Sequence, residues 1–295
     1  MKRLTNSIKT NQTNIKALDQ VIAGYKLMQC MKFEEAIKSF NKALRIKPNF
    51  ADANSAKGSV FLRLGRYEES LKEYEQAIKF KSEDARLYGR KGLALMQFER
   101  YEEALKAFNY VIEQNAADAD TFSDKGKALY ELQQHDEALI AFDKAIELDP
   151  KPYFPYLQKG KIFQSLARYD EAISMYDQAL SCSNINIFTT QATMLLKVEI
   201  LGKQNKWDEL EVILEDPKLS EVWEEAKATQ NVFLAKCAYG KGEYGKALEY
   251  CDEAMRLDNN VMSAALHIKI SSLMSPFGDQ KSLAFRRRED IMKLL

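Results

Sequence analysis

The side chains that could carry acid–base, nucleophilic or metal chemistry are few and scattered in this sequence. It contains two histidines, His135 and His267, and four cysteines at positions 30, 182, 237 and 251. Metal ligation and histidine-based proton transfer need such groups clustered at short spacing, and the sequence has no such cluster. His135 stands in a column of aromatic residues described below, so we interpret it as a packed imidazole, with a functional role as the alternative.

Two cysteines and two carboxylate pairs allow a chemical and a structural interpretation. Cys237 and Cys251 could approach each other as a redox pair, but we interpret them as small apolar residues in packing positions. Glu68–Glu69 and Glu102–Glu103 begin predicted helices, where negative charge is stabilised. The sequence also lacks a Gly-rich phosphate loop, a dinucleotide fingerprint, an HExxH and a GxSxG motif. We therefore expect no enzyme activity, no cofactor and no metal.

The composition predicts a soluble, helical protein. Its 295 residues are 46% hydrophobic and 29% charged, with only 12 Gly and 6 Pro. The 43 Lys and Arg residues balance 43 Asp and Glu residues, so no net field attracts nucleic acid or an anionic membrane. Neither a signal peptide nor a run of 18 apolar residues is found. Together with the few cysteines, this predicts a cytoplasmic protein without membrane insertion.

A period of 34 residues organises the chain from Gly24 to Ala179. Each of five units contains a glycine from which the other positions are counted. An aromatic residue or His lies nine positions after the glycine, Ala or Ser lies twelve after it, an aromatic residue sixteen after it, and Ala or Val nineteen after it. The columns are Gly24, Gly58, Gly92, Gly126 and Gly160; Phe33, Tyr67, Tyr101, His135 and Tyr169; Ala36, Ser70, Ala104, Ala138 and Ala172; Phe40, Tyr74, Phe108, Phe142 and Tyr176; and Ala43, Ala77, Val111, Ala145 and Ala179. Such a fixed period indicates a repeat array.

Each unit is predicted to be a pair of helices. In the first unit, apolar residues recur at amphipathic-helix spacing over 36–44, and Pro48 ends that helix. The small residues, such as Gly24 and Ala36, should lie where the two helices cross, because a missing or one-carbon side chain lets the backbones approach.

These columns resemble the tetratricopeptide repeat family, whose pattern has Gly or Ala at the eighth position, aromatics at the seventeenth and twenty-fourth, and Ala at the twentieth and twenty-seventh. Gln20 and Asn54 depart from the family's bulky fourth position, and Ser70 and Val111 depart from its alanines. The resemblance implies an all-α fold: a right-handed superhelical α-solenoid of helix-turn-helix units in one elongated array, with C-terminal capping helices.

We predict five segments along the chain. Leu210 takes a small-residue position in the sixth unit and should push its two helices apart, and one long helix fits between Ser220 and Tyr239. The segments are an N-terminal arm over 1–16, frayed or forming a short leading helix; five regular units over 17–186; a degenerate, phase-shifted sixth unit over 187–227; a seventh unit over 228–261; and a capping helix with an amphipathic tail over 262–295.

In the family, the first helix of each unit lines a concave groove, so the resemblance implies a binding surface here. For Arg86 and Arg90 two interpretations stay open: ion pairs with Asp120 and Asp124 of the next unit, or recognition of an acidic peptide. The groove should be apolar at its start and basic further along. The candidate residues are Tyr25, Arg63, Arg86, Arg90, Leu93, Lys127, Tyr130, Phe154 and Lys161.

Family members that hold the C-terminal carboxylates of heat-shock chaperones carry Lys and Asn, then Asn, then Lys and Arg on three successive first helices. Only the last two of the matching residues agree here: Val21, Tyr25, Ala56, Arg86 and Arg90. We predict a non-catalytic scaffold or adaptor that binds a peptide or helix of a protein partner within a multiprotein complex. The alternatives are a chaperone-associated co-factor protein without that clamp and an RNA-binding repeat protein, against which the neutral charge argues. The repeats indicate no particular partner or oligomeric state.

Overall fold

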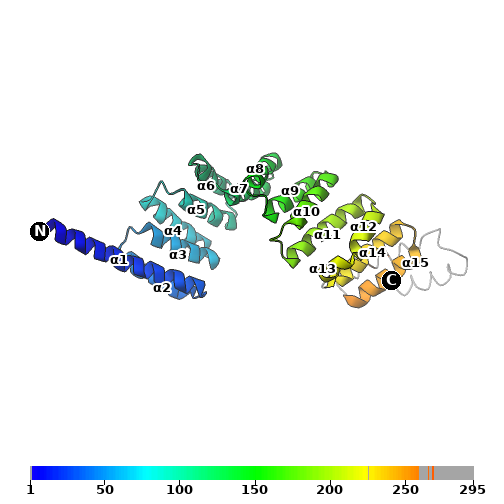
Figure 1. Ribbon diagram of the computed structural model, residues 1–295, viewed down its shortest axis with the longest axis horizontal. Coiled ribbons are helices and arrows are strands. Elements are labelled where there is room, and N and C mark those ends of the chain that lie inside the picture. Colours follow the sequence, from blue (N-terminus) through cyan, green and yellow to red (C-terminus); the bar gives the residue numbers. More distant parts are fainter. Residues whose placement is uncertain (1, 225, 259–264, 266–267, 269–295) are drawn as a thin grey trace, which may run out of the picture. The chain divides into compact units, whose positions relative to one another are not determined.

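A computed structural model describes residues 2–224, 226–258, 265 and 268; for residues 2–10 and 218 it describes the backbone alone. All regular structure in this part of the chain is helical (Figure 1). The chain divides into two compact units, Met1–Pro150 and Lys151–Leu295. Two prolines, Pro150 and Pro152, occupy the connection and remove backbone donors there.

The first unit consists of four helix pairs. The first helix of each pair packs against the second, and successive first helices contact one another: α1 with α3, α3 with α5, and α5 with α7. Its helices are α1 (Lys2–Gln29), α2 (Phe33–Ile46), α3 (Ala51–Arg63), α4 (Tyr67–Phe80), α5 (Ala85–Gln97), α6 (Tyr101–Glu113), α7 (Ala119–Glu131) and α8 (His135–Leu148).

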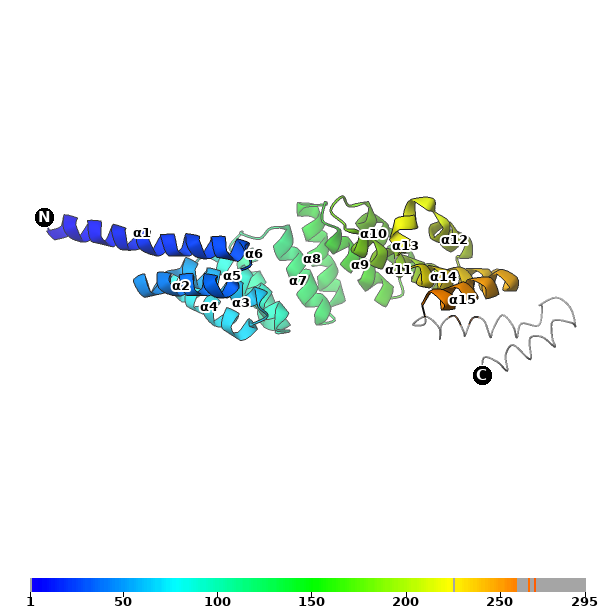
Figure 2. The same ribbon diagram turned by 90° about the horizontal axis from the view of Figure 1, so that it is seen from below.

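The N-terminal arm predicted over 1–16 is not a separate element. Residues from Lys2 onward belong to α1, one helix of 28 residues that extends past the end of α2 (Figure 2). The segment before Ile15 contains neither Gly nor Pro, so nothing in it ends the helix.

The glycine column packs against the aromatic column sixteen residues later, within the same helix pair. A β-carbon added at Gly92 would lie 2.6 Å from Cε1 of Phe108, and one at Gly126 would lie 2.7 Å from Cε1 of Phe142. Both rings are almost fully buried. The prediction that small residues mark the helix crossing is confirmed, and the structure adds that a ring fills the space which glycine leaves.

The turn within each pair repeats a conformation rather than a residue type. One turn residue has a positive φ of 56–70° in each of five pairs, at Met31, Gly65, Glu99, Gln133 and Ala167. The next amide then bonds to a carbonyl five residues back, as when Arg100 N–H donates to Leu95 O at 2.9 Å. Only Gly65 is the residue type that this backbone conformation favours.

The second unit begins with a regular pair and becomes irregular after it. Its elements are α9 (Tyr153–Ser165), α10 (Tyr169–Ser181), α11 (Ile187–Lys203), α12 (Trp207–Glu215), a 3₁₀ turn (Pro217–Leu219), α13 (Ser220–Glu224), α14 (Lys227–Gly240) and α15 (Tyr244–Leu257). The long helix predicted between Ser220 and Tyr239 is wrong, because α13 ends at Glu224 and α14 begins at Lys227.

Tertiary contacts account for that break. Trp223 is 1% exposed and packs with Val198, Leu210 and Leu214 of α11 and α12. The Gln191 side chain on α11 also donates to the Val222 carbonyl at 3.0 Å. These contacts hold α13 on the preceding helices, while α14 pairs with α15.

The sixth pair, α11 and α12, has other residue sizes at the positions that form the crossing in the regular units. Val198 stands where the regular units have glycine, and Leu214 stands where they have a ring; both are buried in one cluster with Leu210. Valine is larger than the glycine of the regular units, and leucine is smaller than their ring, so the total side-chain volume at these two positions changes less than either substitution alone would change it. The predicted separation of these two helices stays a prediction.

The predicted capping segment lies mostly outside the described residues, as does His267. Two of its residues, Ala265 and Ile268, are buried against Val232, Ala235 and Cys251. They cover the apolar side of the last helix pair, α14 and α15.

Candidate functional site

A small polar cavity opens on the first helices of the first unit. Its volume is about 140 Å³, and it brings together Tyr25, Arg86 and Arg90, three of the predicted groove residues. The remaining lining residues are Asp52 and Ser55 of α3, Asp84 just before α5, and Leu87 of α5. Helices α1, α3 and α5 each contribute to this cavity.

Arg90 is exposed and reaches across to α3. Its Nη1 donates to Ser55 Oγ and Ser59 Oγ, both at 3.3 Å. The Ser59 hydroxyl lies 3.0 Å from the hydroxyl of Tyr74, whose pKa is raised by burial. Among the described residues Arg90 forms no ion pair, so its positive charge is held in place by neutral hydroxyls.

The other charges around the cavity are already paired. Arg86 binds Asp84 through Nε and Nη2, both at 3.0 Å, and this hydrogen bonding lowers the pKa of the Asp84 carboxyl. Asp52 pairs with Lys81 at 2.8 Å. Arg90 is therefore the one charged lining residue that forms no ion pair within the described part of the chain.

The interpretation that Arg86 and Arg90 pair with Asp120 and Asp124 is wrong. Arg86 turns back to the N-terminus of its own helix, and Arg90 turns toward the preceding α3. The aspartate at 84 is an N-cap whose side chain accepts from the Arg86 amide. A polar residue directly before a helix signals such a cap in the sequence, and this signal could have predicted the Arg86 contact.

An apolar stripe on α1 leads to the cavity. Ile15, Leu18, Ile22 and Tyr25 are 59%, 48%, 45% and 40% exposed, and their spacing places them on one side of the helix. Tyr25, the last of them, also lines the cavity and packs edge-on against Phe40 with ring centroids 5.7 Å apart. Of these four exposed side chains, Tyr25 is the one that lines the cavity with Arg90.

The other predicted residues lie outside the cavity. Arg63 is exposed at the end of α3, Leu93 is 38% exposed on α5, and Lys127 and Tyr130 are half-buried on α7. Tyr130 packs against His135 with ring centroids 5.9 Å apart, in line with a packed imidazole.

Phe154 and Lys161 belong to α9, in the second unit. Both are half-buried there. Their participation in one groove with Arg90 stays a prediction.

Asp124 takes the same position on α7 that Arg90 takes on α5. Burial, and then the nearby Asp120 carboxylate, raises the pKa of Asp124 to about 6, and Lys127 opposes the shift. The folded chain therefore binds this proton more tightly than the unfolded chain. The resulting stabilisation is complete below the ordinary pKa of 3.8 and is lost as the pH rises through 6.

Asp124→Asn should raise the free energy of unfolding by about 2 kcal/mol at pH 8, because the amide carries no buried charge. The gain should shrink toward pH 4, where the wild-type carboxyl is protonated. Urea unfolding at both pH values measures the difference, with Asp19→Asn on the exposed side of α1 as the control. An equal gain at both pH values would contradict this assignment.

In the described part of the chain, the cysteines form no disulfide and the potential metal ligands do not cluster. All four cysteines are free; Cys237 donates to the Trp207 carbonyl at 3.1 Å, and burial raises its pKa to about 11. Within the described ranges, no group of three or more His, Cys, Asp or Glu residues could hold a metal ion. No described helix has the length and apolar character needed to cross a membrane.

Paired helices at a 34-residue period, each glycine packed on a ring, define a helical-repeat protein. Family models described as tetratricopeptide repeat match residues 24–65, 58–97, 90–151 and 155–184. The chain belongs to the tetratricopeptide repeat family.

Solved structures show the same fold at low sequence identity. PilF of Pseudomonas aeruginosa is 20% identical, with a TM-score of 0.59 over 74% of this chain and 99% of that one. MamA of Desulfovibrio magneticus RS-1 is 21% identical, with a TM-score of 0.53 over 56% of this chain and 93% of its own. YrrB, described as having an unusual peptide-binding site, is 23% identical, with a TM-score of 0.52 over 64% and 97%. No curated protein sequence matches the chain.

Proposed function

We propose that this protein is a non-catalytic scaffold that binds an acidic peptide or helix of a partner protein at the cavity between α1, α3 and α5. The observation that carries the proposal is Arg90, an exposed cation whose described partners are two serine hydroxyls. A carboxylate is a stronger acceptor for a guanidinium than a hydroxyl is, so an acidic group would displace or join the serines.

The apolar stripe beside the cavity supports a peptide rather than a free anion. Ile15, Leu18 and Ile22 each expose nearly half of their side chains or more along α1, next to Tyr25. A ligand that buries these side chains gains about 25 cal/mol for each Å² of apolar surface removed from water. An acidic residue flanked by apolar residues therefore matches both parts of the site.

The repeat architecture supports the proposed role of an adaptor in a multiprotein complex, because stacked helix pairs offer extended surfaces for other chains. We place this function in the cytoplasm. Four free cysteines, among them the exposed Cys30, suit a reducing compartment, in which thiols persist without forming disulfides.

Arg90→Glu should weaken binding of an acidic peptide at least about tenfold, because a favourable charge contact becomes a repulsive one. The probe is a fluorescein-labelled 12-residue peptide of alternating Leu and Glu, and the measurement is fluorescence anisotropy with full-length protein. Arg45→Glu, an equal charge change at an exposed position on α2, is the matched control and should bind like the wild type.

Equal affinity of the Arg90→Glu and wild-type proteins would contradict the proposed site. A single-stranded RNA oligonucleotide that binds more tightly than the peptide, with a steep dependence on salt, would instead favour the nucleic-acid alternative.

A further inference from the structure

Helix α1 has one apolar side that packs into its own unit and a second apolar side that remains exposed. The exposed side carries Ile15, Leu18 and Ile22. The buried residues of α1 lie about 100° further round the helix; they include Ala17, Val21 and Met28. Figure 2 shows α1 continuing past the end of α2, so another helix can lie along its exposed side without displacing the packing of the unit.

The residues on this exposed side follow an alternating spacing of three and four residues. The same spacing continues toward the N-terminus in the sequence, and all of these positions belong to the single helix α1. We call them the α1 seam: Leu4, Ile8, Asn11, Ile15, Leu18 and Ile22. An average spacing of 3.5 residues is the repeat of a left-handed coiled coil, whose core positions are termed a and d.

The residue types of the α1 seam favour two parallel strands. Position a is isoleucine each time, at Ile8, Ile15 and Ile22. Position d is leucine on both sides of Asn11. Isoleucine at a combined with leucine at d favours a parallel pair of helices over three or four strands.

Asn11 indicates that the second strand is another copy of this chain. A side-chain amide that enters an apolar core needs a hydrogen-bond partner there. Two copies in parallel and in register place Asn11 opposite Asn11, so that each amide can donate to the other. A single polar residue at a core position also fixes the register of a coiled coil and its number of strands.

The residues beside the α1 seam allow two copies to approach each other. Gln12 at position e and Asn14 at position g are neutral, and both are exposed. Asp19, the next e residue, would face Asn14 of the other copy, since g pairs with the following e in a parallel dimer. Lys16 stands at position b, on the outer side of such a pair. None of these contacts brings like charges together.

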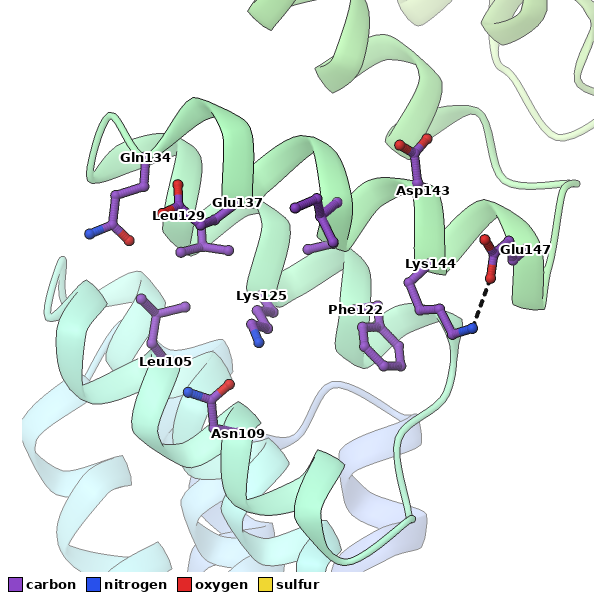
Figure 3. Close-up of a pocket in the computed structure, with 12 residues that line it drawn as sticks. Leu105, Asn109, Phe122, Lys125, Leu129, Gln134, Glu137, Asp143, Lys144 and Glu147 are labelled. Atoms are coloured by element: carbon purple, nitrogen blue, oxygen red, sulfur yellow. Dashed lines mark hydrogen bonds and ion pairs between the residues drawn. The ribbon is translucent and has the colours of Figure 1, made fainter.

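The cavity between α6 and α8 is a contrasting apolar surface. Its volume is about 660 Å³, and Figure 3 shows that its lining side chains come from different helices. Leu105, Phe122 and Ile140 belong to α6, α7 and α8 respectively. Such a lining specifies no geometry for an occupant, whereas the α1 seam specifies the number, direction and register of the helices that pair along it.

We propose that α1 forms a parallel, in-register two-stranded coiled coil with α1 of a second copy of this chain. The α1 seam from Leu4 to Ile22 is about 27 Å long, which corresponds to about five helical turns. The dimer covers Ile15, Leu18 and Ile22, which the proposed acidic peptide also contacts. Dimer and peptide therefore compete for this part of α1, and self-association regulates access to it.

Sedimentation equilibrium of the full-length protein tests the dimer in the absence of any peptide. We expect the mass of two chains at high concentration and dissociation on dilution. Ile15→Asp combined with Leu18→Asp should weaken the dimer at least about tenfold, because it puts unpaired charges into the core of the coiled coil. Lys16→Asp introduces the same residue beside the α1 seam and should dimerise like the wild type. Circular dichroism checks that the variants keep their helices.

A monomer at every concentration would overturn the proposal and leave the α1 seam to a helix of another protein. A trimer, or a dimer that the double variant does not weaken, would overturn it as well. Arg90→Glu should leave the dimer unchanged, because Arg90 lies outside the α1 seam. The dimer can therefore fail while the acidic-peptide site holds, and the reverse.

Cross-linking tests the direction and register of the two helices. Asn11→Cys, in a chain that also carries Cys30→Ser, should form a disulfide between two copies on oxidation, because parallel in-register pairing brings position 11 next to itself. Lys16→Cys in the same background is the control and should cross-link much less. Equal cross-linking at the two positions, or a dimer without cross-linking at position 11, would overturn the proposal.

Discussion

Gly92→Val is expected to lower the free energy of unfolding by about 3 kcal/mol, because overpacking a filled core forces rings and backbone to move. The β-carbon that valine adds would lie 2.6 Å from Cε1 of Phe108, a ring that is 1% exposed. Gly89→Val on the same helix is the matched control. Its β-carbon would lie 3.8 Å from Val111, an ordinary contact distance, so we expect a loss of less than about 1 kcal/mol.

A double-mutant cycle tests whether the glycine and the ring act as one unit. Phe108→Ala alone should cost about 4 kcal/mol through lost burial and the cavity that remains. In that background the valine enters space which the ring has left, so the double variant should be more stable than the sum of the single losses by at least about 1 kcal/mol. Denaturant unfolding followed by circular dichroism gives the four values, and strict additivity would show that the two positions do not share a core site.

Trp223→Ala should destabilise the second unit by about 4 kcal/mol, because its indole is among the largest fully buried side chains and joins α13 to α11 and α12. Trp223→Phe should cost less than about 1.5 kcal/mol. The buried indole Nε1 has no hydrogen-bond partner among the residues that the structure describes, so phenylalanine removes an unsatisfied donor while it keeps most of the apolar volume.

The control for Trp223 is Val212→Ala, at a position on α12 that is 72% exposed, where we expect a change within about 0.5 kcal/mol. Thermal and urea unfolding, monitored by circular dichroism, measure all three variants. If the phenylalanine variant loses as much stability as the alanine variant, the indole N–H has a partner and the packing account of α13 is wrong.

The repeat phase made the regular helix pairs predictable from the residues alone. Steric requirements act at fixed spacing: Gly126 must be small because Phe142, sixteen residues on, fills the same crossing. The family resemblance pointed to Tyr25, Arg86 and Arg90 as groove residues, and these three line one cavity. The glycine–ring inference depends on distances within one helix pair, which the sequence specifies.

Other features were decided by contacts between distant segments. The break between Glu224 and Lys227 has no Gly or Pro to signal it and follows from burial of Trp223 against α11 and α12. The partners of Arg90 are serines 31 and 35 residues away rather than the aspartates of the next repeat.

The sequence by itself determined the family, the helix pairs and the glycine–ring crossings, because these depend on residue size at a constant period. Tertiary structure alone decided which charges meet and where α13 ends. Such outcomes depend on how several side chains share one volume, and no spacing along a single helix contains that information.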